Sequence, residues 1–387
     1  MSYIVWIVAL SAAFASALNG TMVMPVMAMA LGRIPGINDT LATAIGSAEI
    51  AGIALYCLFL PRLAQRWRRQ ATLGGIAALI AGEALTHILS GALPLAGARL
   101  LAGLGEGAIF NLVAIQLASL ANAERLWGQI NLIGGSTMGF LLYGLSLLPA
   151  SEGRGPIFLW LAAFAAAMAP LILLMRRPSG VATVAAAAAP LHRRHVGLAL
   201  ATVFLIYGVQ AGEWAVSGYL GERIGMTQDT IGFYLALSSI AGFVGALLPT
   251  LTRNPAHRLP GVILGIAAMA VSLYCFFNIH SPLVFLLGQV FVNVGFYAAT
   301  PYVTGLLTEN DPDGALLMRT LIVALFGAAG GTAVAGEMLD DFGPSSFGLA
   351  LIAILAVTAI GATQVFRRAV APGFTGEAAE LRASISS

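Results

Sequence analysis

The stretch that decides the fold is residues 94–120, PLAGARLLAGLGEGAIFNLVAIQLASL. It exceeds the roughly 20 mainly apolar residues that a membrane-spanning helix needs. Its only charged side chains are Arg99 and Glu106. The stretch therefore predicts a transmembrane helix that carries an arginine and a carboxylate inside the bilayer.

The composition extends this prediction to the whole chain of 387 residues. Hydrophobic residues make up 59% of it and charged residues 9%, against roughly 25% charge in soluble domains. A net charge of +2 is too balanced for a nucleic-acid binder. All basic residues are arginine, which excludes a P-loop lysine and a lysine Schiff base. Cys57 and Cys275 lie in apolar runs, so a disulfide framework is not expected.

Twelve apolar runs of helical length follow one another along the chain. The longest break between them, 176–195, separates six runs from six. We therefore predict an all-α integral membrane protein with two six-helix bundles, at 1–175 and 196–367, a cytoplasmic central loop at 176–195 and a cytoplasmic tail at 368–387. The runs are 3–31, 40–60, 71–91, 94–120, 126–148, 156–175, 196–220, 229–251, 259–279, 282–307, 314–338 and 346–366.

The distribution of arginine predicts the orientation. Segments on the side of the N-terminus hold fourteen arginines, whereas the opposite loops hold three, Arg33, Arg154 and Arg223. The positive-inside rule then places both termini in the cytoplasm. The lysine-free, alanine-rich composition suggests a GC-rich bacterial genome, and hence the cytoplasmic (inner) membrane of a bacterium.

One motif carries a family resemblance. Residues 99–105, RLLAGLG, fit the pattern R-x-x-x-G-x-G on the fourth helix, and the second and third helices are joined by a basic loop. With six plus six helices, the chain resembles the major facilitator superfamily of secondary transporters. The loop signature G-x-x-x-D-R-x-G-R matches only at Arg66 and Arg69, since Pro61 and Gln65 replace its glycine and aspartate.

The glycine-rich fifth and eleventh helices are candidates for conformational change. The Gly-Pro motif of many family antiporters is absent from the fifth helix. Small residues allow close helix packing, which is their alternative role. The gating candidates are Arg66, Arg69, Gly134, Gly135, Gly330 and Gly331.

The resemblance implies that helices 1, 4, 7 and 10 line a central cavity and that the protein acts as a monomer. Polar residues recur at helical spacing on all four of these runs, and such groups avoid lipid. They could alternatively bond neighbouring helices. The substrate-binding candidates are Asn19, Thr21, Asn111, Tyr207, Gln210, Trp214, Gln289, Asn293 and Tyr297.

Ionisable residues inside the predicted helices are candidates for proton coupling. Each costs about 3 kcal/mol on insertion scales, so pairing, water or protonation is needed. Arg99 and Glu106 are separated by about 10 Å along the helix axis, which disfavours a direct pair. Depth from the outer surface favours Glu49 or Glu83 as the partner of Arg99. Glu83 and His87 are four residues apart and can touch. The candidates are Glu106, Arg99, Glu49, Glu83, His87 and Glu213.

We therefore expect a proton-coupled carrier of a small organic solute that works by alternating access. The N-terminal half would handle protons and the C-terminal half would offer neutral hydrogen bonds to the solute. Uptake of a small organic acid or nutrient is favoured because Arg99 can hold a carboxylate. Proton-driven efflux of drug-like amphipathic compounds is the alternative.

Three other classes of membrane protein compete with a carrier. A polytopic membrane enzyme is disfavoured because H-E-x-x-H, G-x-S-x-G and paired intramembrane aspartates are absent from the sequence. No cofactor and no metal site are expected, since histidine and cysteine do not cluster. A sensor without flux and a passive channel are both compatible with twelve apolar runs, and the dependence of flux on protons would distinguish a channel from a carrier.

Overall fold

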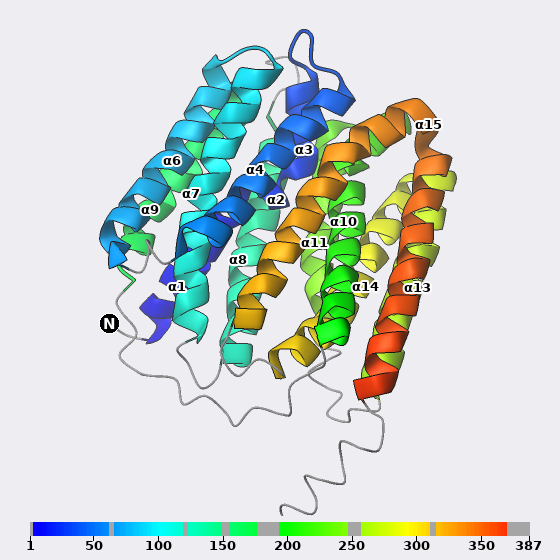
Figure 1. Ribbon diagram of the computed structural model, residues 1–387. Helices are drawn as coiled ribbons and strands as arrows, with labels where there is room; N and C mark the ends of the chain where they lie inside the picture. Colours follow the sequence, from blue (N-terminus) through cyan, green and yellow to red (C-terminus); the bar gives the residue numbers. More distant parts are fainter. Residues whose placement is uncertain are drawn as a thin grey trace, which may run out of the picture.

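The computed structural model describes residues 3–61, 66–118, 123–148, 155–175, 193–246, 257–309 and 315–369. Their regular secondary structure is helical, and the helices run roughly along one axis (Figure 1). Eight of the described helices are long and apolar enough to cross a membrane. The predicted all-helical membrane fold is thereby confirmed.

The first half of the chain forms helices α1 to α9, which we call the N-group. The run predicted at 3–31 is divided into three pieces, and each later run to residue 175 coincides with one helix. The helices are α1 (Tyr3–Ala17), α2 (Asn19–Met22), α3 (Met24–Gly32), α4 (Asp39–Phe59), α6 (Arg68–Ile88), α7 (Ala92–Ala118), α8 (Ala123–Ser146) and α9 (Gly155–Leu173).

The second half forms helices α10 to α15, which we call the C-group. They are α10 (Arg193–Arg223), α11 (Gln228–Gly245), α13 (Arg258–Asn278), α14 (Pro282–Glu309) and α15 (Ala315–Ala369). The last of these covers two predicted runs, which meet at a bend. At the bend Gly343 has a φ of 77°, which glycine adopts without strain, and Pro344 follows.

Two predicted segments fall largely outside the described residues. The structure describes the central loop only from residue 193, where α10 begins, and the C-terminal tail only to residue 369. The division into two bundles with these boundaries stays a prediction.

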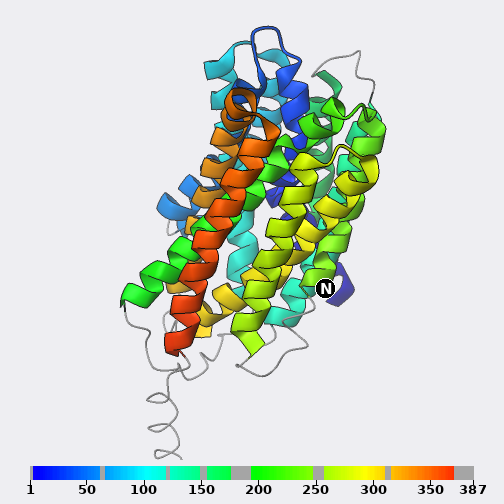
Figure 2. The same cartoon turned by 90° about the vertical axis from the view of Figure 1, so that its right-hand side faces the viewer.

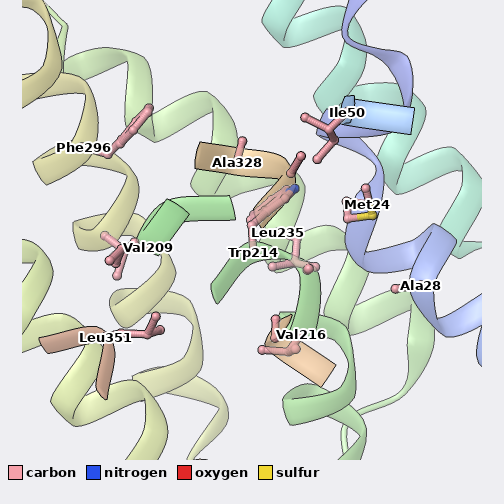
Figure 3. Close-up of a cluster of buried hydrophobic side chains, with 14 of the residues drawn as sticks. Met24, Ala28, Ile50, Val209, Trp214, Val216, Leu235, Phe296, Ala328 and Leu351 are labelled. Carbon is pink, nitrogen blue, oxygen red and sulfur yellow. The ribbon is translucent and has the colours of Figure 1, made fainter. Parts of the chain in front are cut away.

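Helix packing brings the two groups together along several contacts. Within the N-group α7 packs on α4 and α6, and within the C-group α10 packs on α15 and α14. Between the groups, α4 lies along α15, α8 along α11, and α3 along α10 (Figures 1 and 2). Buried apolar side chains join both groups in one core; Figure 3 shows Met24 and Ile50 from the first, with Val209, Trp214 and Phe296 from the second.

Residues 33–38, the turn after α10 and the bend of α15 lie at one end of the molecule, which we call the Arg33 end (Figure 1). The chain begins at the opposite end, which we call the N-terminal end. At the Arg33 end, the Asn38 side chain caps α4 by accepting a hydrogen bond from the Leu41 N–H at 2.9 Å.

Candidate functional site

The first membrane-spanning segment is broken in its middle. Leu18 (φ −122°, ψ 20°) separates α1 from α2, and Val23 (φ −95°, ψ 9°) separates α2 from α3. Pro25 is the second residue of α3 and lacks an N–H, which suits the first turn of a helix. Breaks of this kind release backbone groups that require other partners within a membrane. Two of them, the Gly20 N–H and the Met22 carbonyl, bond side chains from other helices.

A buried ion cluster lies beside this break. Arg99 of α7 binds Glu83 of α6 with both terminal nitrogens, at 2.7 and 3.3 Å. It also forms an ion pair with Glu49 of α4. All three side chains are completely buried. The guanidinium carbon lies 5.5 Å from the ring centroid of Phe158 on α9, so an aromatic face covers the cation.

Glycines allow the three helices of the ion cluster to approach closely. A Cβ on Gly52 of α4 would lie 2.6 Å from the Leu100 carbonyl oxygen of α7. A Cβ on Gly82 of α6 would lie 2.5 Å from the Ala102 backbone nitrogen. The carboxylates one residue after Gly82 and three before Gly52 therefore reach the guanidinium on α7. Such small-residue contacts are common between membrane helices.

Glu106 binds the broken helix rather than the arginine. One of its carboxylate oxygens accepts a hydrogen bond from the Gly20 N–H at 2.9 Å, and the other has no hydrogen-bond partner among the described residues. A Cβ on Gly20 would coincide with the carboxylate of Glu49. Gly20 thus lies between Glu49 and Glu106, and it contacts both because it has no side chain.

Three polar N-group candidates also carry unsatisfied atoms. Asn19 is fully buried, and neither its amide oxygen nor its amide nitrogen has a partner in the described chain. The Asn111 amide oxygen and the Thr21 hydroxyl are likewise unpartnered there. Buried groups of this kind are normally satisfied by protein, water or a ligand. Polar atoms in need of a partner therefore flank the break in the first helix.

A second polar cluster lies between α10 and α14 of the C-group. The Gln210 amide donates to Asn293 at 3.1 Å, and the Asn293 amide donates to the Gln289 backbone carbonyl at 2.9 Å. The Gln289 side-chain amide donates to Glu213, which is completely buried. These four side chains form the α10–α14 cluster.

Aromatic rings flank the α10–α14 cluster. Tyr207 of α10 packs edge-to-face on Phe296 of α14, with ring centroids 4.9 Å apart, and Tyr297 packs on Phe296 at 5.2 Å. Tyr207, Gln210 and Tyr297 are half-buried. The cluster therefore combines hydrogen-bonding groups with apolar surfaces, as binding sites for small organic molecules commonly do.

The broken helix is also bonded to the C-group. The Trp214 indole N–H donates to the Met22 carbonyl at 3.2 Å, and the Tyr219 hydroxyl donates to the Ala28 carbonyl at 2.7 Å. Trp214 directly follows Glu213 in the sequence. One discontinuous helix thus contacts the ion cluster on one side and α10 on the other.

Ion pairs join the two groups at the Arg33 end. Arg33 of the N-group binds Glu222 of α10 at 3.1 Å, and Arg223 of α10 lies 4.0 Å from Asp39 of α4. Close by, the Thr43 hydroxyl accepts a hydrogen bond from the Gly336 N–H at 3.2 Å. These contacts hold the N-group and the C-group together at this end of the molecule.

The predicted gating residues lie in varied surroundings. Arg66 and Arg69 are exposed where α6 begins, at the N-terminal end. Gly134 packs on α1 and Gly331 on the Gly208 carbonyl of α10. Gly135 is buried, while Gly330 is exposed and faces open space.

The proton-coupling candidates do not all lie in one cluster. Glu49, Glu83, Arg99 and Glu106 gather around the break in the first helix, whereas Glu213 belongs to the α10–α14 cluster. His87 is half-buried near the end of α6. The pairing of Arg99 agrees with the sequence argument from depth, although the structure uses both proposed carboxylates. No cluster of metal-ligating side chains occurs among the described residues.

Sequence reasoning missed Gly20, Tyr219 and the ion pairs of Arg33 and Arg223. The sequence does carry a signal for the role of Gly20, because a glycine and a proline (Gly20 and Pro25) within a single predicted helix indicate a break. The ion pairs had no such signal, since charges at helix ends are common in any membrane protein.

A buried ion cluster and a discontinuous helix between two groups of membrane helices are features of a secondary transporter. The comparisons give the family: residues 9–316 match the sequence profile of the Major Facilitator Superfamily. The chain belongs to this superfamily, and it is a multi-pass membrane transporter rather than an enzyme. A search of curated protein sequences finds no match.

Among the solved structures that share this fold are two transporters. One is a bacterial homolog of the human lysosomal transporter Spinster, in an inward-facing and occupied conformation. It is 15% identical, with a TM-score of 0.71 over 93% of this chain and 96% of that one. The other is the human organic anion transporter MFSD10 (TETRAN), 13% identical, with a TM-score of 0.68 over 93% and 98% of the two chains.

Proposed function

We propose that the protein is a proton-coupled secondary transporter of a small organic solute and works by alternating access. The observation that carries this proposal is the ion cluster, in which Glu49, Glu83 and Glu106 gather near a single cation, Arg99. With every group ionised the cluster would hold three negative charges and one positive charge, a net charge of −2. Unbalanced charge is costly to bury, so proton uptake is the natural means of neutralising the cluster.

Glu106 is the proposed proton carrier. Glu49 and Glu83 form ion pairs with the guanidinium, whereas Glu106 forms none with any described residue and bonds only a backbone N–H. A carboxylate accepts a stronger hydrogen bond than a neutral carboxyl group does. The bond from Gly20 to Glu106 would therefore weaken when Glu106 takes up a proton.

The broken helix is the proposed connection between protonation and conformational change. Gly20 and Met22 belong to the same short helix, α2, which Glu106 holds from one side and Trp214 from the other. Weakening one contact would alter how firmly the N-group and the C-group are joined. A proton and a solute that bind the two conformations with different affinities are then thermodynamically linked.

The test uses purified protein in liposomes that hold a pH-sensitive dye. A panel of organic acids, sugars, amphipathic cations and neutral drugs is added with and without an imposed pH gradient. A solute that drives proton movement with wild-type protein is expected to drive none with Glu106→Gln. The matched control is Glu337→Gln, because Glu337 is exposed on α15. Full solute-driven proton movement in Glu106→Gln would reject the assignment.

The preference for an organic acid relied on Arg99, and the geometry gives it little support. Both terminal nitrogens of Arg99 already bind carboxylates. Freeing one for a substrate would break a buried ion pair, which costs about 3–5 kcal/mol. We therefore separate the substrate from the ion cluster. Symport and antiport, and thus uptake and efflux, are distinguished by the sign of the pH change in the same assay.

The proposed setting is the inner membrane of a bacterium, with both termini in the cytoplasm and the protein acting as a monomer. The excess of arginine on the side of the N-terminus supports this orientation. The Arg33 end would then face outward, and its ion pairs would close the outer side. Labelling of single cysteines from either side of the membrane tests the orientation.

A further inference from the structure

We propose that the α10–α14 cluster binds a protonated amine, so that the transported solute carries an ammonium group. This inference rests on the proposed function, because it names the substrate class of the same transporter. It concerns Gln210, Glu213, Gln289 and Asn293. The ammonium would be held by the oxygen atoms of the first three.

The orientation of two amides in the cluster follows from one backbone atom. The Gln289 carbonyl can only accept, so the Asn293 side chain must turn its nitrogen toward it, at 2.9 Å. The Asn293 oxygen then faces Gln210, which must present its own nitrogen, at 3.1 Å. The Gln210 oxygen is therefore directed away from this contact.

The same reasoning applies at the other end of the chain of hydrogen bonds. An ionised Glu213 can only accept, so Gln289 presents its nitrogen to it. As a result, three oxygens have no hydrogen-bond donor in the described part of the chain, one each on Gln210, Glu213 and Gln289. All of the unsatisfied atoms of the cluster are acceptors. A ligand that completes this cluster must supply donors, and an ammonium group supplies up to three.

The charge of the cluster favours the same ligand. Glu213 is completely buried and makes no ion pair with any described residue. Arg33, Arg99 and Arg223 form ion pairs within the described part of the chain, and each binds a carboxylate other than Glu213. A buried carboxylate without a cation is costly. A cationic ligand would compensate this charge and satisfy the free oxygen at once.

The surroundings favour an organic cation over a metal ion. Tyr207 and Phe296 pack together beside Gln210 and Asn293, and Trp214 follows Glu213. Aromatic faces attract cations and also cover apolar groups attached to them. Tyr207, Gln210 and Tyr297 are half-buried, so the described residues do not enclose the cluster completely on that side.

The test uses a trio of probes with one shape and three charges: 2-phenylethylammonium, 2-phenylethanol and phenylacetate. Binding to purified wild-type protein is measured by calorimetry and by thermal stabilisation. The ammonium is expected to bind, and the alcohol and the carboxylate are expected to bind at least tenfold more weakly. In Glu213→Gln, affinity for the ammonium should fall about 10- to 100-fold, as for loss of a charge-assisted hydrogen bond.

Two matched variants and one salt control complete the experiment. Glu337→Gln changes an exposed carboxylate and should bind the ammonium like the wild type. Gln210→Leu should weaken binding of the ammonium without creating affinity for phenylacetate. In one arm sodium chloride is added to an otherwise sodium-free buffer. If sodium alone stabilises the wild type and not Glu213→Gln, the cluster is a sodium site and the proposal is wrong.

Three results would overturn the proposal: no ammonium binding to wild type, equal binding of the three probes, or unchanged ammonium binding in Glu213→Gln. Glu106→Gln separates this proposal from the proposed function. If it still binds the ammonium but moves no protons, both proposals stand. If it retains proton movement while Glu213→Gln loses ammonium binding, the coupling assignment fails and the substrate assignment survives.

Discussion

Replacement of Gly20 by alanine gives a direct test of the ion cluster. The added Cβ would coincide with the carboxylate of Glu49, so either Glu49 must leave Arg99 or helix α2 must shift. Overpacking that a small shift relieves costs about 1–3 kcal/mol. Breaking a buried ion pair costs about 3–5 kcal/mol. We therefore expect Gly20→Ala to destabilise the protein by between about 1 and 5 kcal/mol.

The assay is thermal unfolding of the purified protein in detergent, together with the liposome assay. Gly97→Ala is the matched control, since Gly97 is exposed in α7 and a Cβ there would meet open space. In that position alanine should stabilise by about 0.5–1 kcal/mol, as in other helix interiors. Gly20→Ala should also lose coupled proton movement, because a shift of α2 displaces the N–H that binds Glu106.

A double-mutant cycle identifies the cause of the loss. In a Glu49→Ala background the space beside Gly20 is empty, so Gly20→Ala should cost far less than in the wild type. The difference between the two costs measures the clash. Equal behaviour of Gly20→Ala and Gly97→Ala would refute this reasoning. An undiminished loss in the Glu49→Ala background would refute it as well.

Three further outcomes are expected. Arg99→Lys should lower the free energy of unfolding by about 1.5–3 kcal/mol, because lysine keeps the charge but cannot reproduce both bonds to Glu83; an unchanged melting temperature would contradict the ion cluster. Trp214→Phe should cost about 1–3 kcal/mol, since it leaves the Met22 carbonyl without its donor, and thermal unfolding measures this. Tyr219→Phe removes the hydrogen bond to the Ala28 carbonyl and should weaken closure at the Arg33 end. Distances between spin labels placed across this end should then increase, and unaltered distances would argue against the hydrogen bond holding the groups together.

The sequence predicted the helical membrane fold because hydrophobicity is a local property. A run of apolar residues long enough to cross the bilayer can satisfy its backbone hydrogen bonds within itself by forming a helix. The runs at 94–120 and 282–307 coincide closely with α7 and α14. The seven-residue spacing of Arg99 and Glu106 also correctly indicated that Arg99 has other partners.

The break in the first helix was not predicted, since the run at 3–31 indicates a single helix. Its free backbone groups are satisfied by Glu106 and Trp214, which lie far away in the sequence. Whether a membrane helix can be interrupted depends on such partners. Sequence alone did not supply the partners, because they come from helices α7 and α10.

The sequence by itself determined which ionisable and polar side chains lie within the membrane, since each is fixed by the helix that contains it. Only the tertiary structure decided how they are grouped. It assigned Glu49, Glu83 and Glu106 to one cluster and Glu213 to another. In the sequence all four are simply carboxylates within predicted membrane helices. The physical reason is that a buried charge is stabilised by atoms within a few ångströms, and those atoms belong to whichever helices pack together.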